Sequence, residues 1–118
     1  MSDIKGTLFY SQIRDKLSNN IVDILNDKNI TVNNVSSILI ENMKIVEQYR
    51  SLSGCDKKEL IIEGFYDYID NNIITETEAI KSKIIIKNLI PNLIDIIIKI
   101  DKKEIKIKNK YKKKLFCF

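Results

Sequence analysis

Histidine and tryptophan are absent from this 118-residue sequence, and cysteine, glycine and proline are scarce, with two, three and one residues respectively. Without histidine, acid–base catalysis at neutral pH would need a carboxylate or a lysine whose pKa is strongly shifted by burial. Gly6, Gly54 and Gly64 are too scattered to build a P-loop or a dinucleotide-binding fingerprint. No group of carboxylates has the spacing of a calcium-binding loop. The sequence therefore predicts a protein that is not an enzyme, with no catalytic residues, no metal and no cofactor.

The two cysteines, Cys55 and Cys117, are isolated in the sequence, with neither CxxC spacing nor histidines to complete a zinc site. We therefore expect a reducing, intracellular environment, with a packing role for Cys55. The first ten residues lack the basic region and the apolar run of a signal peptide. The most apolar window, residues 84–100, is interrupted by charged side chains and is short for a bilayer span, so no transmembrane segment is predicted.

Isoleucine, lysine and asparagine, in contrast, make up nearly half of the chain, with 25, 18 and 12 residues. Their codons are built almost wholly from A and T, which indicates a strongly AT-biased genome such as those of some giant DNA viruses, protists and bacterial parasites. With 44% hydrophobic and 31% charged residues, the chain has enough apolar side chains for one packed core.

The spacing of apolar residues at steps of three and four predicts four helical segments. They cover approximately residues 8–27, 32–52, 53–72 and 75–98. The fourth segment is apolar around most of its circumference, so we expect it to be the central, most buried helix. Pro91 lies inside it and predicts either a kink or a break at residues 88–90.

Local signals mark the ends of these segments. Ser53 is predicted to cap the third helix by accepting a hydrogen bond from the backbone three residues on, and Thr75 with Glu78 forms a capping box at the fourth. Gly54 is expected to end the second helix in a left-handed conformation.

Residues 104–111 alternate between isoleucine and polar residues, which favours a short edge strand or an extended tail. The predicted fold class is all-α, a compact bundle of four to five helices with a basic C-terminal tail. The predicted division is a helical bundle domain at residues 1–100 and a lysine-rich tail with an apolar end at residues 101–118.

The charge of the chain is unevenly distributed. Residues 1–98 carry 11 basic and 14 acidic side chains, whereas residues 99–114 carry nine lysines and two acidic residues. Such a lysine block is typical of a solvated tail, a nuclear-import patch, or a contact for phosphate, a protein partner or anionic lipid. The candidate residues for binding nucleic acid or a partner are Lys102, Lys103, Lys106, Lys108, Lys110, Tyr111, Lys112, Lys113, Lys114, Phe116 and Phe118.

The last four residues, Leu-Phe-Cys-Phe at 115–118, are apolar directly after a run of lysines. Phenylalanines exposed to water at a chain end would be unfavourable, so we expect another surface to cover them. We expect them either to fold back onto the bundle or to dock into a partner or a membrane interface.

Two segments carry a resemblance to a known family. They are KIVEQYRSLSGCDKKEL at residues 44–60 and LIPNLIDIII at residues 89–98, a little under a quarter of the chain. In them, LSG followed by KK and leucine, and then LIP followed by LID, resemble a small helical family of nucleocytoplasmic giant DNA viruses of the mimivirus kind. The matching residues belong to helix caps and to the core. The resemblance therefore implies a helical fold and a viral source, and it implies no catalytic role.

We predict a viral interaction or structural protein, a component of the virion or of the virus factory, that acts through helical surfaces and the basic tail. Its location would be the host cytoplasm or the particle, with a protein partner and with homo-oligomers as a further form. The first alternative is a sequence-independent nucleic-acid-binding protein that uses the lysine tail. The second alternative is a helical decoy of host signalling, which would need a groove for an amphipathic helix.

Overall fold

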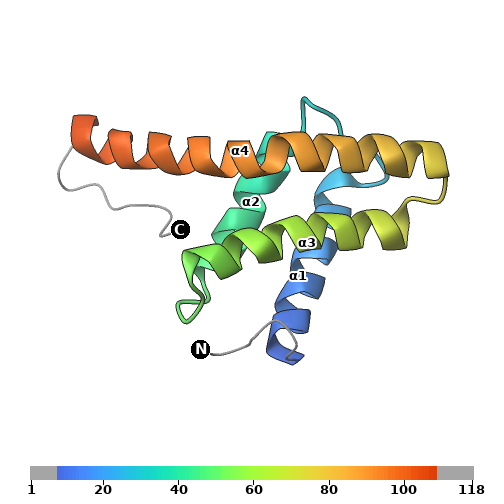
Figure 1. Ribbon diagram of the computed structural model, residues 1–118, viewed down its shortest axis with the longest axis horizontal. Helices are drawn as coiled ribbons and strands as arrows, with labels where there is room; N and C mark the ends of the chain where they lie inside the picture. Colours follow the sequence, from blue (N-terminus) through green and yellow to red (C-terminus); the bar gives the residue numbers. More distant parts are fainter. Residues whose placement is uncertain (1–7, 109–118) are drawn as a thin grey trace.

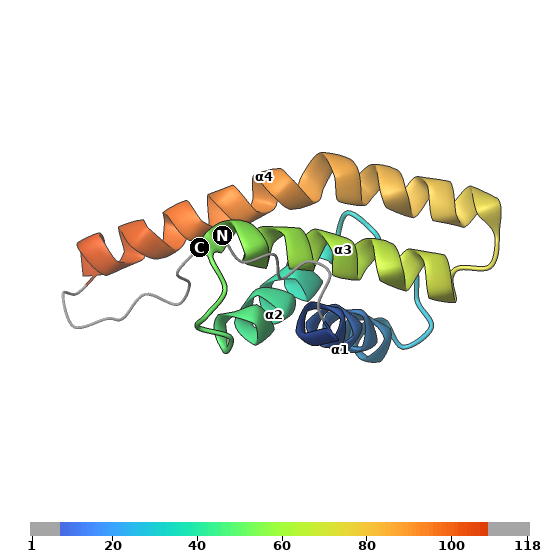
Figure 2. The same cartoon turned by 60° about the horizontal axis from the view of Figure 1, so that its bottom comes forward.

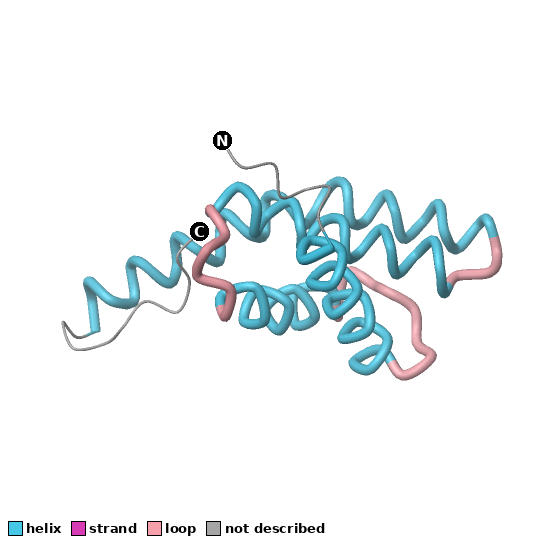
Figure 3. Tube along the Cα trace, turned by 90° about the horizontal axis from the view of Figure 1, so that it is seen from below, coloured by secondary structure: helices cyan, strands magenta, loops and turns pink. Residues whose placement is uncertain are grey.

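The computed structural model describes residues 8–108, with side-chain surroundings for residues 8–100. It consists of α1 (Leu8–Leu25), α2 (Val35–Glu47), α3 (Gly54–Asn72) and α4 (Glu76–Lys108). No strand occurs within this part of the chain, so the prediction of an all-α bundle is confirmed. Figure 3 shows the helices joined by short loops. The division of the chain at residue 100 stays a prediction, and α4 continues across that position without interruption.

The central helix is α3, which packs against α1, α2 and α4. Figure 2 shows α4 on one side of α3, and α1 and α2 on the other. The expectation that the fourth helix would be the central one is therefore wrong. The reason is that α3 buries a broad face, which contacts helices on both of its sides, whereas α4 packs along one face only. The fully buried or nearly buried apolar residues of α3 are Leu60, Ile61, Phe65, Tyr68 and Ile69.

The start of α3 agrees with its sequence signal. Ser53 precedes the helix in an extended conformation, and its side-chain oxygen accepts a hydrogen bond from the backbone N–H of Asp56 at 3.0 Å. This bond satisfies one of the backbone donors that a helix leaves unpaired at its N-terminus. The predicted cap is confirmed.

Gly54, however, does not end the preceding helix in a left-handed conformation. It is the first residue of α3, and no described glycine has a positive φ. Because α2 already ends at Glu47, several residues earlier than predicted, Gly54 is not needed as a terminator. The left-handed residues are Asn26 and Asp27, with φ of 48° and 72°, directly after α1. Short polar side chains tolerate this conformation better than other non-glycine residues do.

Helix α4 passes through Pro91 without a break, and its axis changes direction near the middle of its length (Figure 2). The helix also includes residues 104–108, so the predicted edge strand or extended tail is wrong for these positions. Extending an existing helix by one residue is easier than nucleating a new element, and this outweighs a brief alternation of isoleucines. Residues 109–111 lie outside the described part of the chain.

Candidate functional site

Helix α4 is attached to the bundle along one face, where partly buried residues such as Ile85, Leu89 and Leu93 flank a line of buried ones. Its buried residues follow one another at intervals of four: Ser82, Ile86, Ile90 and Ile94. Four other isoleucines of the same helix remain about half exposed, at 52% for Ile80, 53% for Ile84, 50% for Ile96 and 55% for Ile100. Because isoleucine is usually among the most buried residue types, this exposure makes the outer surface of α4 the candidate site.

The exposed isoleucines form two separate patches. Since each residue of an α-helix is rotated by about 100° from the one before, Ile84 and Ile100 lie about 160° apart around the axis. We call Ile80 and Ile84 the N-terminal patch, and Ile96 and Ile100 the C-terminal patch. Two groups on different faces cannot form one continuous surface, so each is considered separately.

The C-terminal patch lies where α4 leaves the bundle. Two ion pairs of 3.1 Å fix the antiparallel register of α3 and α4: Lys58 with Asp95, and Asp70 with Lys83. In two antiparallel helices, residues at the same level have numbers with a constant sum, and this sum is 153 in both pairs. Gly54, the first residue of α3, therefore lies at the level of Lys99. The last part of α4, residues 100–108, therefore extends beyond the start of α3 by about 13 Å at 1.5 Å per residue. Figure 1 shows this projecting end.

The charge beside the C-terminal patch is basic. Lys99 is exposed and lies between the two isoleucines in sequence. Asp95 is one turn before Lys99, and its carboxylate is already paired with Lys58. The backbone then continues as helix through a segment with more lysines than acidic residues. The end of α4 thus combines half-exposed isoleucine side chains with positive charge.

The structure places the predicted binding residues in two groups. Four of them lie within α4, where the structure describes only the backbone: Lys102, Lys103, Lys106 and Lys108. The others, Lys110, Tyr111, Lys112, Lys113, Lys114, Phe116 and Phe118, lie outside the described residues. Sequence reasoning did not select Ile96 and Ile100. The available signal was the excess of apolar positions on the fourth helix, more than one packed stripe can cover.

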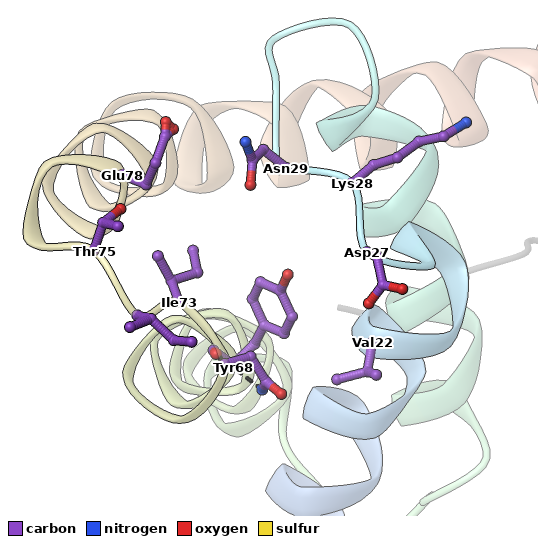
Figure 4. A pocket seen from close by; sticks show the side chains of 10 residues that line it. Val22, Asp27, Lys28, Asn29, Tyr68, Ile73, Thr75 and Glu78 are labelled. Carbon is purple, nitrogen blue, oxygen red and sulfur yellow. Dashed lines mark hydrogen bonds between the residues drawn. The ribbon is translucent and has the colours of Figure 1, made fainter.

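A cavity of about 260 Å³ opens at the other end of the bundle, between the α1–α2 turn and the α3–α4 turn (Figure 4). Asp27, Lys28 and Asn29 line it from the first turn, and Thr75 and Glu78 from the start of α4. The ring of Tyr68 projects between the two sides. Burial, and secondarily the carboxylate of Asp27, raises the pKa of Tyr68 above its ordinary value.

The cavity offers polar contacts beside the apolar side chains of Val22, Ile73 and Ile74. None of the residues that line it is a histidine or a cysteine. Within the described residues, no group of three or more histidine, cysteine, aspartate or glutamate side chains is placed to hold a metal ion. The charges of Asp27, Lys28 and Glu78 are mixed in sign, so the cavity does not select a ligand of one charge.

A second group of ionisable side chains lies between α1 and α3. The Tyr10 hydroxyl is buried near Glu63, Glu59 and Asp56, and burial followed by these carboxylates raises the pKa of Tyr10. Arg14 partly offsets the negative charge, with its guanidinium 3.7 Å from the carboxylate of Glu63. This arrangement keeps the Tyr10 hydroxyl protonated. The packing of α1 against α3 is sufficient to explain why these side chains lie together.

The described helices include none that is both long and apolar enough to cross a membrane. Comparisons with family models, with curated proteins and with solved structures found no match to this chain. Function is therefore inferred from the surfaces described above.

Proposed function

We propose that this protein is a non-enzymatic interaction protein whose binding element is the outer surface of α4 together with the basic segment that follows it. The observation that carries the proposal is the half-exposure of Ile80, Ile84, Ile96 and Ile100 on one helix. In each of the two patches, a pair of apolar side chains lies one turn apart on the surface, which is typical of sites that a partner covers. The resemblance of residues 44–60 and 89–98 to a giant-virus family supports a role in the virion or in the virus factory.

The proposal is tested by photo-crosslinking. A photoreactive phenylalanine analogue would replace Ile84 in one version of the full chain and Ile96 in another, in infected or transfected cells. The control places the same analogue at the exposed Asp15 of α1, a helix that does not pack against α4. We expect a defined protein or lipid adduct from α4 that is lost when the neighbouring isoleucines of the same patch are changed to serine. Adducts that are equal at all three positions, or unaffected by the serine changes, would reject the proposal.

A second candidate function is sequence-independent binding of nucleic acid by the lysine tail. The observation that favours it is the separation of charge: α4 leads away from a body with excess acidic residues into a segment with nine lysines and two acidic residues at 99–114. Each neutralised phosphate releases counterions, so binding should fall steeply between about 50 and 200 mM salt. Fluorescence anisotropy with short single- and double-stranded DNA and RNA would measure this. Binding that is absent at low salt would reject this candidate.

A further inference from the structure

We propose that the end of α4 from Ile96 onward, where the helix leaves the bundle, binds an anionic lipid surface, with Ile96 and Ile100 inserted among the headgroups and Lys99 beside them on the lipid phosphates. This inference deepens the proposed function, on which it rests, by naming the partner of the C-terminal patch. It concerns a helix that lies on a membrane and does not cross it.

The first support for a lipid partner is the geometry of the projecting end. Because α3 begins at the level of Lys99, the last turns of α4 have no neighbour from α3, as the register of the Lys58–Asp95 and Asp70–Lys83 pairs shows. Ile96 and Ile100 are one turn apart, so they lie on the same face, and each is about half exposed. A helix that projects from a bundle can lie flat on a surface without disturbing the packed core.

The position of the charges around the helix points the same way. Taking about 100° per residue, positions 102, 103 and 106, all of them lysines, fall within about 60° of Lys99, whereas Ile96 and Ile100 lie about 60° and 100° away from it on one side. The acidic positions 101 and 104 lie about 160° and 140° from Lys99. Asp95, on the same side, already has its charge paired with Lys58 at 3.1 Å. The lysine positions of this segment therefore cluster around Lys99, next to the half-exposed Ile96 and Ile100, an arrangement typical of helices that lie at membrane interfaces.

The combination of charge and apolar surface favours a membrane over a second copy of the chain or nucleic acid as the partner of the C-terminal patch. A second copy docked symmetrically on this patch would bury only the two half-exposed isoleucines of each chain, far less than the roughly 800 Å² per partner that a stable interface buries. Nucleic acid would engage the lysines and leave the isoleucines in water. An anionic lipid surface satisfies both groups at once, because apolar side chains enter the interface while lysines contact the headgroups.

The test is co-sedimentation of the full chain with vesicles of phosphatidylcholine alone and of phosphatidylcholine with about 30% phosphatidylserine. We expect binding to the anionic vesicles and little to the neutral ones. The double variant I96S/I100S should bind about tenfold more weakly. The matched control is I24S/I74S, which makes the same changes at two exposed isoleucines outside α4, with exposures of 40% and 98%, and should bind like the unaltered chain. Far-UV circular dichroism would verify that both variants fold.

Three outcomes would overturn this assignment: no binding to anionic vesicles at about 50 mM salt, full binding by I96S/I100S, or an equal loss in both double variants. Full binding by I96S/I100S would mean that lysines alone hold the lipid. A chain that crosslinks to a protein through position 96 and ignores vesicles would overturn the membrane assignment while leaving the proposed function intact. Absence of both crosslinks and vesicle binding would reject the two together.

Discussion

A Cβ atom on Gly64 of α3 would lie 2.9 Å from the Cβ of Leu17 on α1. Both residues are buried, and Leu17 presents the part of its side chain nearest its own backbone. A contact this short cannot be relieved by turning a flexible side chain. The two helices are therefore held at a separation that only glycine permits at position 64.

Substituting Gly64→Ala should lower the free energy of unfolding by about 1–2 kcal/mol. The added methyl group forces α1 and α3 apart, which outweighs the gain of up to about 1 kcal/mol that alanine brings to a helix. Urea unfolding followed by circular dichroism would measure the change. Gly54→Ala is the control, since Gly54 begins α3 without a positive φ, and it should be neutral or stabilising. Equal effects at both positions would contradict the close approach.

The ion pair of Lys57 and Glu47 joins the start of α3 to the end of α2, and it is largely buried, with side-chain exposures of 5% and 17%. Changing Glu47→Gln should lower the free energy of unfolding by about 2–3 kcal/mol, because the lysine charge stays buried without its counterion. The double variant E47L/K57M should recover most of this loss, since both charges are then removed. If E47L/K57M is less stable than Glu47→Gln in urea unfolding, the buried charge of Lys57 is not the cause of the lost stability.

The hydrogen bond that Ser53 accepts from the Asp56 backbone predicts a smaller effect. Ser53→Ala leaves that donor without its side-chain partner and should lower the free energy of unfolding by about 1 kcal/mol. Ser51→Ala, two residues earlier and in the exposed turn, serves as the control and should have little effect. A thermal unfolding curve for each variant is sufficient. The cap would be ruled out as a stabilising contact if both serines could be replaced without change.

The helices themselves could be predicted from the sequence because their signals are local. Apolar residues at steps of three and four mark which face of each helix is buried, and Ser53 marks where α3 begins. The central position of α3 could not be predicted in this way. It depends on the close approach at Gly64 and on contacts between helices far apart in the sequence. A helix that packs against neighbours on one side and a helix that packs on two sides can show the same spacing of apolar residues.

The candidate site was predicted only in part for the same reason. The lysine block is visible as composition, so it can be recognised from the amino-acid sequence alone. The exposure of Ile96 and Ile100 depends on where α3 starts relative to α4, a register fixed by pairs such as Lys58 and Asp95. Lys58 and Asp95 are 37 positions apart in the sequence. No local pattern in the sequence contains that information.

The buried Tyr10 predicts how stability changes at alkaline pH. Its pKa is raised above the ordinary value of about 10 by burial and by Glu63, Glu59 and Asp56, so the folded state keeps a proton that the unfolded state has lost. The contribution of Tyr10 to stability is fully present below about pH 10, and it then falls by about 1.4 kcal/mol per pH unit as the pH rises. Tyr68 acts in the same direction, because its pKa is raised too.

Urea unfolding of the unaltered chain and of Tyr10→Phe, at pH 9 and again about two units higher, would isolate this effect. Phenylalanine cannot ionise, so the variant should lose less stability between the two pH values than the unaltered chain does. All other groups are common to both proteins, so their effects cancel in the difference. Measuring each protein at pH 9 also removes any fixed effect of deleting the hydroxyl. Identical losses in the two proteins would mean that Tyr10 ionises as readily in the folded bundle as in the unfolded chain.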